Sequence, residues 1–426
     1  MKILVVGGGG REHALCWKIR KSPLVKQLYC APGNAGIAQE AELVDIGAED
    51  IPALIDFVIE KAINLVVVGP EAPLVAGLGD RLRAIGISVF GPNSDAAQVE
   101  ASKAFTKELC DRANIPTARY GKFSDPDSAK AFLDELSPPY VLKADGLAAG
   151  KGVVIPETRD EAEAEIDDMM SGKFGEAGKT LVIEEFLKGE EASFFALCDG
   201  KNAMPMIAAQ DHKRIFDGDK GPNTGGMGAY SPTPIAGYSI IRQTMIEIIM
   251  PAIKTLADEG MPYSGVLFAG LMISEDGPKL IEFNARFGDP ECQIMMMRLL
   301  SDIVPYLKAC ADSELALMPP MSWHGSAAVT VVMAANGYPG RYEKGTEIRN
   351  VEKADELDQV TVFHAGTTRG PNGQLLAYGG RVLNVTASGN TYSEAISRAY
   401  EAVDTIDWPE GFCRRDIGWR ALKTSS

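Results

Sequence analysis

The sequence predicts an α/β and α+β protein with a doubly wound parallel sheet at the N-terminus, a two-part middle and a small α+β unit at the C-terminus. Three observations predict this class. The first hundred residues alternate short β-branched runs with amphipathic stretches, the pattern of strand-helix-strand units. From Tyr120 the pattern changes to hairpin-like strands. After Met318, strands and glycine turns precede one last helix.

The N-terminal unit is expected to contain strands at 2–6, 27–31, 43–46 and 64–69, with helices at 12–21 and 53–61. Glycine and proline follow the strand ends, at 7–10, 32–36, 69–73 and 91–93. Parallel strands bring their carboxyl ends to one edge of the sheet, where doubly wound folds collect ligands. We therefore expect one ligand site across these loops.

The rest of the chain divides where the pattern changes. A helix over 94–113 leads out of the first unit, and we place a boundary near 115–121. Strands at 192–197, 204–210, 265–273 and 279–283 mix with helices at 239–259 and 293–308, as in a helical layer on an antiparallel sheet. The last unit is expected to hold strands at 327–335, 361–366 and 379–387 and a helix at 392–405. The expected domains are 1–118, 119–191, 192–320 and 321–426.

Composition and charge exclude several classes of function. The chain of 426 residues is 46% hydrophobic and 23% charged, as ordinary globular proteins are. Its formal net charge of −16 would repel a phosphate backbone, which argues against nucleic-acid binding. Seven scattered cysteines, an apolar start too short for a signal peptide and the lack of a long apolar run favour a reduced, cytoplasmic protein away from membranes.

The first glycine run, at 6–12, follows a strand and opens a helix, so its free N–H groups and the helix dipole form an anion cradle. A dinucleotide fingerprint would require a glycine where Glu12 or His13 stands, and an acid after the strand that ends in Ala31. We therefore discount nicotinamide binding and the oxidoreductase class. Arg11 opposes the helix dipole, which a bound phosphate would explain.

The second glycine run, at 143–152, fails the P-loop pattern because only three residues separate Gly146 from Gly150 and a glycine follows Lys151. We interpret it as a hairpin flap over phosphates. Lys143 ends an apolar strand, where its ammonium can reach a phosphate oxygen.

Strand alternation predicts a polar and an apolar face for the stretch at 280–291. The polar face holds Glu282, Asn284 and Arg286, and the apolar face holds Ile281, Phe283, Ala285 and Phe287. A carboxylate and an amide carbonyl two residues apart suit a hard cation such as Mg²⁺, and a guanidinium suits a carboxylate or phosphate. Mg²⁺ here implies nucleotide phosphates.

Two further stretches are candidates for the site. Residues 182–191 end a buried strand with acids and a turn, which fits either a hinge between lobes or a surface loop. Residues 210–228 form a long charged, glycine-rich segment, and such loops usually cover or line an active site.

Six stretches together resemble the phosphoribosylamine–glycine ligase family of the ATP-grasp superfamily. They lie at 9–15, 31–36, 69–71, 143–152, 223–232 and 282–291, in this order over essentially the whole chain. The resemblance implies a Rossmann-like N-terminal domain, an ATP-grasp core of two lobes and a small C-terminal domain. It also implies ATP-dependent ligation of glycine to 5-phosphoribosylamine in purine biosynthesis, through glycyl phosphate and with Mg²⁺ or Mn²⁺.

The resemblance assigns roles residue by residue. It implies phosphate-holding lysines, flap glycines, an adenine-facing hinge and a ribose ligand for ATP, at Lys103, Lys143, Gly146, Gly150, Gly152, Glu184, Glu185, Leu187 and Glu191. It implies the metal ligands Glu282 and Asn284, and a glycine end formed by Arg286, Asp211, Lys213, Gly225 and Gly226. The phosphate of phosphoribosylamine would lie on Gly8, Gly9, Gly10 and Arg11, with Asn34 and Glu71 facing the sugar.

Two alternatives stay open at this stage. Another ATP-grasp carboxylate–amine ligase would differ mainly in its acceptor, and a nucleotide-binding regulatory module would keep the ATP residues without turnover. Intact Glu282, Asn284 and Arg286 argue against the module. We expect a monomer rather than an obligate oligomer. We also expect Arg286→Ala and Glu282→Ala to abolish turnover and leave the fold intact, since exposed polar faces contribute little to stability.

Overall fold

The computed structural model describes residues 1–146, 152–173 and 178–424. Its N-terminal part is a parallel sheet in the order β3-β2-β1-β4-β5. The strands are β1 (Lys2–Gly7), β2 (Gln27–Pro32), β3 (Glu42–Leu43), β4 (Leu65–Val68) and β5 (Ser88–Phe90). Leu4 and Val6 enter one hydrophobic core, whereas Ile3 and Val5 enter another on the opposite face. Both faces are therefore covered, as the predicted doubly wound sheet requires.

The helices of this part are α1 (Gly10–Ile19), α2 (Ile51–Lys61), α3 (Glu71–Val75) and α4 (Leu78–Ala84). The chain order reverses between β1 and β4, which are adjacent strands. The loops after these two strands therefore diverge and leave a crevice at the carboxyl edge of the sheet. The predicted strand at 43–46 is shorter, because β3 lies exposed at the sheet edge and ends at Leu43.

The predicted single helix at 94–113 is wrong. The chain forms α5 (Gln98–Ala101) and α6 (Lys103–Ala113), separated by the extended residue Ser102. The Ser102 hydroxyl accepts a hydrogen bond from the N–H of Phe105 at 3.0 Å. A serine in this position satisfies a free amide of the first turn, so Ser102 starts a new helix.

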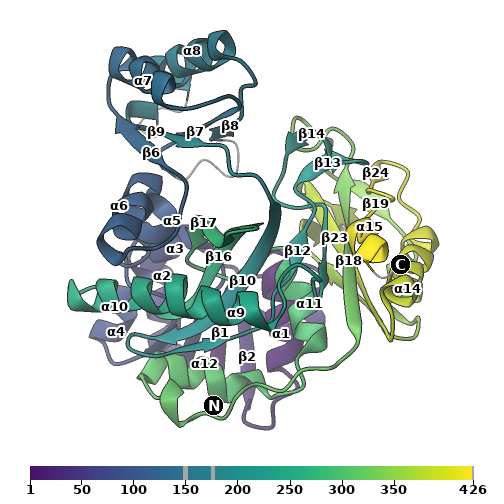
Figure 1. Cartoon of the computed structure of the whole chain (residues 1–426). Coiled ribbons are helices and arrows are strands. Elements are labelled where there is room, and N and C mark those ends of the chain that lie inside the picture. Colours follow the sequence, from purple (N-terminus) through teal and green to yellow (C-terminus); the bar gives the residue numbers. More distant parts are fainter. Residues whose placement is uncertain (147–151, 174–177, 425–426) are drawn as a thin grey trace.

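The small lobe of the middle part projects away from the rest of the molecule (Figure 1). Its antiparallel strands, in the order β6-β9-β7-β8, are β6 (Tyr120–Phe123), β9 (Leu181–Glu185), β7 (Tyr140–Ala144) and β8 (Val153–Val154). Helices α7 (Pro126–Phe132) and α8 (Arg159–Asp168) cover it. Leu142, Ile166 and Ile183 pack in a core of its own, so this lobe is a separate packing unit.

The large lobe is built on an antiparallel sheet, as predicted, in the order β11-β10-β16-β17. The strands are β10 (Glu190–Asp199), β11 (Ala203–Pro205), β16 (Ser264–Ser274) and β17 (Gly277–Asn284). Helices α9 (Tyr238–Thr244), α10 (Met250–Asp258), α11 (Glu291–Arg298) and α12 (Ile303–Asp312) accompany it. The predicted helix at 293–308 is two helices, because Asp302 caps α12 by accepting from the N–H of Val304 at 3.0 Å.

The C-terminal sheet has the order β12-β15-β18-β23-β20, with β24 (Gly411–Phe412) paired to β18. Its strands are β12 (Gln210–Asp211), β15 (Gly228–Ser231), β18 (Ala327–Ala335), β23 (Arg381–Gly389) and β20 (Val360–His364). Helices α13 (Val351–Asp355), α14 (Tyr392–Thr405) and α15 (Trp419–Thr424) pack around it. Because β12 and β15 come from the middle of the chain, Asp211 lies on the C-terminal sheet.

Smaller strands complete this region. The hairpin of β13 (Arg214–Phe216) and β14 (Lys220–Asn223) stands beside the C-terminal sheet (Figure 1). A separate sheet holds β19 (Thr346–Ile348), β22 (Leu375–Ala377) and β21 (Thr367–Arg369). The predicted strand at 204–210 is wrong in its middle, since β11 ends at Pro205 and β12 begins at Gln210.

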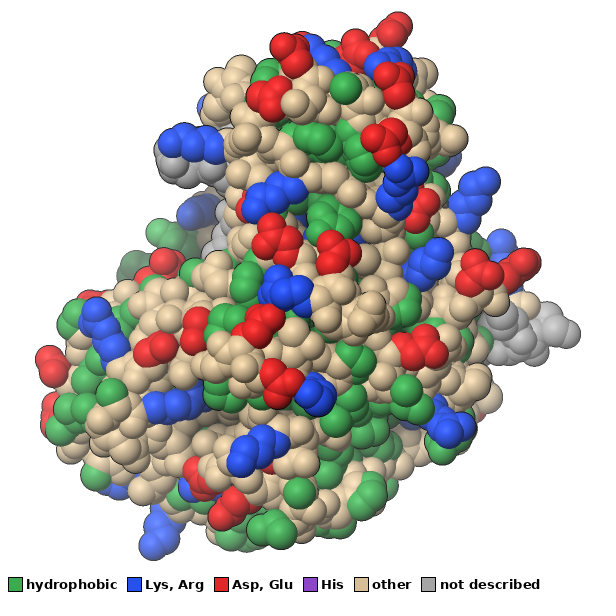
Figure 2. Space-filling model, turned by 60° about the vertical axis from the view of Figure 1, so that its left-hand side comes forward, with side chains coloured by type: hydrophobic (Ala, Val, Ile, Leu, Met, Phe, Trp, Pro, Cys, Tyr) green, Lys and Arg blue, Asp and Glu red, His purple; other side chains and the backbone are tan. Residues whose placement is uncertain are grey.

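The surface carries charges of both signs. Figure 2 shows acidic and basic side chains interspersed on one face, so the net charge of −16 is not gathered into a single patch there. Within the described ranges, no helix combines the length and the apolar character needed to cross a membrane.

Candidate active site

Two adjoining cavities bring most of the predicted site residues together. The first cavity, about 430 Å³, is lined by Arg11, Glu71, Lys103, Lys143, Gly152, Glu184, Asp211, Lys213, Gly225, Glu282, Asn284 and Arg286, among others. The second cavity, about 490 Å³, is lined by Lys143, Glu184, Glu185, Leu187, Glu191, Asp211, Lys213 and Glu282, with apolar neighbours. The residues common to both form a shared wall, so reacting groups bound in the two cavities can meet there.

Some predicted residues do not line either cavity. These are Gly8, Gly9, Gly10, Asn34, Gly146 and Gly226, whereas Gly150 lies outside the described residues. The Asn34 amide donates to the carbonyl oxygens of Gly8 and His364, both at 2.9 Å. Its carbonyl oxygen accepts from two amides of its own loop. Asn34 therefore joins the first glycine run to β20.

Two lysines share one buried carboxylate on the common wall. Lys143 at the end of β7 and Lys107 on α6 lie 2.7 and 2.9 Å from the Glu184 carboxylate. Burial raises the pKa of Glu184, but the two ammonium groups outweigh it and hold that pKa below its usual range. Sequence reasoning missed Lys107, although its position one helical turn after Lys103 places both lysines on one face of α6. The wall thus presents cations suited to phosphate oxygens.

Lys103 stands at the start of α6, facing the same wall. Its ammonium donates to the carbonyl oxygen of Gly146, at the beginning of the second glycine run. Burial lowers the pKa of Lys103, and the carboxylates of Glu282 and Asp145 work in the opposite direction. Asp145 accepts hydrogen bonds from Ser102 and from the N–H of Ala104, each at 3.2 Å. The base of the second glycine run is therefore fixed to the N-terminus of α6.

Glu282 places its carboxylate where the two cavities meet, and Asn284 places its side-chain oxygen in the first cavity. A bulge in the pairing of β16 and β17 leaves Ile281 without a partner, so alternation fails there. The prediction that Ile281 lies on the apolar face is wrong, because it lines both cavities. Phe283 and Ala285 are buried in the core as predicted, and Phe283 also borders the first cavity.

The donor set fits a magnesium-type ion that also uses substrate oxygens. Mg²⁺ is commonly held by one or two protein oxygens together with phosphates and water. Within the described residues there is no cluster of three or more histidine, cysteine or acidic side chains of the kind that cages a metal alone. Glu282 and the Asn284 carbonyl, beside Lys103 and Lys213, fit an ion brought together with a polyphosphate.

Arg286 pairs with two carboxylates of the N-terminal part. Its guanidinium lies 2.7 Å from Glu100 and 3.3 Å from Glu71, and it donates to the Asn284 carbonyl at 3.2 Å. Burial raises the pKa of Glu100. At Glu71, burial is outweighed by Arg286 and Arg11, together with a backbone hydrogen bond, which lower its pKa. Glu100 was not predicted. The expected sugar-facing residue Glu71 thus lies against the expected catalytic cation.

Asp211 and Lys213 form the other side of the shared wall. Lys213 lies 2.6 Å from the Glu191 carboxylate. Burial disfavours its charge, but Glu191, Asp211 and Glu282 together raise the pKa of Lys213. Burial raises the pKa of Asp211 to about 7, helped by Glu291 and Glu191 and opposed by Lys213. The wall therefore holds a carboxyl group that titrates near neutrality.

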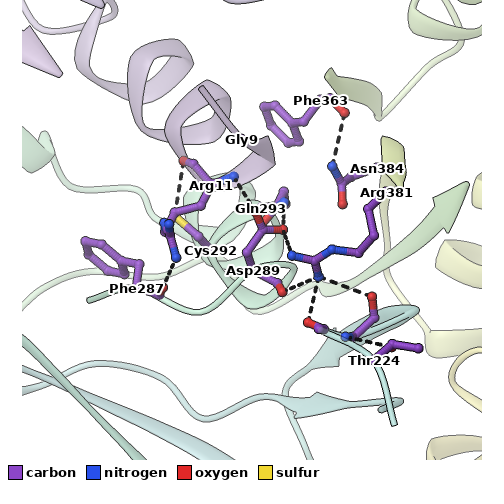
Figure 3. Close-up of polar contacts among 12 residues, drawn as sticks. Gly9, Arg11, Thr224, Phe287, Asp289, Cys292, Gln293, Phe363, Arg381 and Asn384 are labelled. Atoms are coloured by element: carbon purple, nitrogen blue, oxygen red, sulfur yellow. Dashed lines mark hydrogen bonds and ion pairs between the residues drawn. The ribbon is translucent and has the colours of Figure 1, made fainter. Parts of the chain in front are cut away.

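The Asp289 carboxylate already accepts a hydrogen bond from a backbone N–H of the first glycine run (Figure 3). The N–H of Arg11 donates to the Asp289 carboxylate at 3.2 Å, and the N–H of Gly9 donates to Glu12 at 2.6 Å. The Arg11 guanidinium lies 2.7 Å from Glu12 and donates to the carbonyl oxygen of Phe287 at 3.0 Å. Neighbouring carboxylates therefore compensate the charge of Arg11 without a bound phosphate.

Two arginines of the C-terminal part reach the cavities and were missed. Arg381 lines the first cavity and Arg420 the second. Arg420 donates to Asp219 at 2.6 Å and to the carbonyl oxygen of Asp211 at 3.4 Å. No local motif surrounds either residue; only the glycine pair before Arg381 could have drawn attention to it.

The fold and the cavities, together with an ATP-grasp domain model that matches residues 101–292, define an ATP-grasp protein. The biotin carboxylase domain of the 2-oxoglutarate carboxylase of Hydrogenobacter thermophilus, crystallised with MgADP, matches 97% of this chain and 91% of its own. The TM-score is 0.72 and the identity 17%, so the likeness shows the fold alone.

Closer relatives show the family. Models of the N, ATP-grasp (A) and C domains of phosphoribosylglycinamide synthetase match residues 1–100, 101–292 and 328–420. The phosphoribosylamine–glycine ligases of Brucella melitensis and Mesorhizobium japonicum are 57% and 59% identical, each over 99% of both chains. The crystal structure of that ligase from Thermotoga maritima is 31% identical, with a TM-score of 0.84, over 98% of this chain and 100% of its own. This chain belongs to the phosphoribosylamine–glycine ligase family of enzymes, as the six stretches indicated.

Proposed function

We propose that this chain joins glycine to 5-phospho-D-ribosylamine, giving glycinamide ribonucleotide, ADP and phosphate in de novo purine biosynthesis. The observation that carries the proposal is the shared wall, where Lys143, Glu282 and the Asp211–Lys213 pair border both cavities. A reaction with an activated carboxyl intermediate requires the nucleotide and the acceptor to meet in this way. The names of the close relatives support this assignment.

The second cavity suits the nucleoside part of ATP. Its apolar lining includes Leu187, Met272 and Ile281, which suits a flat base. We assign Glu184, Glu185 and Leu187 to the hinge at the adenine and Glu191 to the ribose. Lys103 and Lys143, with Gly146, Gly150 and Gly152, are assigned to the phosphates.

Glu282 and Asn284 are assigned to a divalent cation, Mg²⁺ or Mn²⁺. Such an ion, when bound, neutralises charge on the phosphoryl oxygens during transfer. Lys103, Lys143 and Arg286 would add fixed positive charge around the same oxygens. The protein groups themselves therefore supply much of the stabilisation that a transferring phosphoryl group needs.

The chemistry has two steps. An oxygen of the glycine carboxylate attacks the γ-phosphorus, the bond to the leaving ADP oxygen breaks, and glycyl phosphate forms. The amine of phosphoribosylamine then attacks the carbonyl carbon, and the C–O bond to phosphate breaks as the amide forms. We assign Arg286, Asp211, Lys213, Gly225 and Gly226 to the glycine end. Acyl phosphates react with water, so the second glycine run is assigned as a closing flap.

The acceptor is assigned to the N-terminal side of the first cavity. Gly8, Gly9, Gly10 and Arg11 would hold its phosphate, and Asn34 and Glu71 would lie toward its sugar. Asp289 now accepts from the N–H of Arg11, so a phosphate at this position requires that carboxylate to withdraw. The side chain of Asp289 would turn away from this N–H, while the backbone of its turn stays in place.

Phosphate release from ATP and Mg²⁺ tests the function. Glycine is compared with alanine and serine, with and without phosphoribosylamine generated in place from ribose 5-phosphate and ammonia. We expect release that requires both glycine and the amine. Release with another carboxylate, or independent of the amine, would favour a different ATP-grasp carboxylate–amine ligase.

The surroundings of the reaction are proposed on chemical grounds. All seven cysteines are free thiols, which suits a reducing cytoplasm. We propose that the active form is a monomer rather than an obligate oligomer. Sedimentation at micromolar concentration tests this: a dimer mass with full activity would contradict it.

A further inference from the structure

Arg381 on β23 reaches two segments, the loop before β15 and the turn before α11 (Figure 3). One of its terminal nitrogens donates to the carbonyl oxygens of Gly225 and Asp289, both at 2.6 Å, and of Gly226 at 3.2 Å. The other lies 3.6 Å from the Asp289 carboxylate. A single guanidinium therefore ties the glycine loop at 224–226 to the turn at 287–291.

The glycine loop is shaped to receive this guanidinium. A Cβ at Gly225 would lie 3.1 Å from the central carbon of the Arg381 guanidinium. Gly226 has a φ of +110°, and a Cβ there would lie 2.6 Å from the Pro290 ring. Side chains at these positions would separate the loop from the turn, so the glycine pair and Arg381 form one packed unit.

Asp289 extends the connection to the N-terminal part. Its carboxylate accepts from the N–H of Arg11 at 3.2 Å and from the Gln293 amide at 2.9 Å. Burial raises the pKa of Asp289, but Arg381 and Arg11 outweigh it and keep the group ionised. Arg381 is thus connected to three walls of the first cavity: the glycine loop, the turn and the start of α1.

The second cavity does not involve Arg381. The described residues that line it include Lys143, Glu184 and Glu191 but not this arginine. The hydrogen bonds of Arg381 also lie with the glycine loop and the turn. A change at Arg381 should consequently disturb the glycine loop and the acceptor side more than nucleotide binding, since only Thr224 of that loop lines the second cavity.

We propose that Arg381 is a positioning residue that holds the acceptor side of the first cavity in register with the acyl phosphate. This inference rests on the proposed function. When the guanidinium is absent, the amine is misplaced and water attacks glycyl phosphate instead, returning glycine and phosphate. ATP cleavage then proceeds without amide formation.

The test compares Arg381→Gln and Arg381→Lys with the unmodified chain. ADP and amide product are measured in the same reaction, together with KM for the amine and for ATP. For Arg381→Gln we expect about tenfold more ADP per amide and an amine KM raised about tenfold, since small misplacements of reacting groups have effects of this size. The KM for ATP should change less than about twofold. Lysine keeps the charge but not the fork geometry. The ratio of ADP to amide in Arg381→Lys should therefore lie between those of the unmodified chain and of Arg381→Gln.

Arg398→Gln is the matched control. Arg398 donates to the carbonyl oxygen of Ser388 near the other end of β23 and does not line the described cavities. The Arg398→Gln variant should still release one ADP for each amide formed. A parallel loss of ADP and amide in Arg381→Gln, or an unchanged ratio, would overturn the positioning role.

Hydrogen exchange gives a readout independent of turnover. Arg381→Gln should exchange faster at the amides of 224–228 and at Arg11, while amides of the small lobe stay unchanged. Exchange rates in these segments that equal those of the unmodified chain would also overturn the inference. Failure of the unmodified chain to require the amine would instead refute the proposed function, and the coupling role of Arg381 with it.

Discussion

At the scale of single residues, the site is a set of charges that depend on one another. Lys143 and Lys107 both form ion pairs with Glu184. Arg286 forms ion pairs with Glu71 and Glu100, and Lys213 forms one with Glu191. A buried charge that loses its partner is costly, because its desolvation is no longer compensated. Substitutions here therefore act on stability as well as on ligand binding.

Lys143→Ala should weaken ATP binding by about tenfold, the effect of losing one charge-assisted hydrogen bond of about 1.5 kcal/mol. Lys107 would remain beside Glu184, so this carboxylate keeps one partner. Titration calorimetry with ATP and Mg²⁺ measures the affinity, with Lys122→Ala, an exposed lysine paired to Glu108, as the control. Unchanged affinity would transfer the phosphate role to Lys103.

Glu282→Ala should abolish turnover without unfolding the protein. Glu282 lines both cavities, and a half-buried side chain at a cavity wall contributes little to stability. Turnover and the thermal midpoint are measured on the same preparation. A folded variant with near-normal turnover would refute the metal assignment.

Arg286→Ala should also abolish turnover, but the expectation that the fold is unaffected needs revision. Its side chain is 19% exposed and faces Glu100, which is 8% exposed. Removing the guanidinium leaves two carboxylates without their cation, and breaking such a pair costs about 3 kcal/mol. Urea unfolding of Arg286→Ala and Glu282→Ala, compared directly, checks this difference; equal midpoints would contradict it.

At the scale of elements, the packing of α1 against its neighbours restricts which residues it can carry. Helix α1 packs against α11 and β20, and its first residue, Gly10, faces buried amide groups. A Cβ at Gly10 would lie 2.3 Å from the Asn384 amide nitrogen and 2.5 Å from that of Gln293. The glycine is therefore a requirement of packing between elements.

Gly10→Ala should destabilise the protein by about 1–3 kcal/mol through overpacking. Helix propensity alone predicts the opposite sign, since alanine is favoured over glycine in helices by up to about 1 kcal/mol. The free energy of unfolding, measured by chemical denaturation, decides between destabilisation and stabilisation. Gly47→Ala is the control, because no atom lies within 4 Å of a Cβ there. A Gly10→Ala protein that is more stable than the unmodified chain would show that the side chains of Asn384 and Gln293 move to accommodate the methyl group.

At the scale of the whole molecule, local patterns predicted the elements and the motifs but not their partners. The buried strands of the N-terminal sheet were found because both faces are apolar, and the motif at 282–286 because its polar residues recur on one face. The helix at 94–113 was joined across Ser102, whose capping role depends on the backbone around it. Pairs such as Lys107 with Glu184 and Arg286 with Glu100 join residues far apart in the chain. The periodicity of apolar residues along the sequence does not predict such contacts.

The C-terminal helix illustrates this dependence on distant residues. Arg420 on α15 donates to the carbonyl oxygen of Asp211 and lowers the pKa of Asp211 against the larger effect of burial. Removing this positive charge should move that pKa further above about 7. The ionised carboxylate then forms only at higher pH.

Arg420→Gln should therefore shift the acidic limb of the kcat/KM profile for glycine to higher pH, if ionised Asp211 serves the glycine end. The sign follows because activity rises as Asp211 loses its proton, and a cation nearby promotes that loss. Arg415→Gln is the control, since Arg415 pairs with the exposed Asp404. Rates are measured from pH 5 to 9 with saturating ATP and amine. A limb that stays in place, or moves to lower pH, would separate Asp211 from glycine binding and leave Lys213 and Arg286 as the groups at the glycine end.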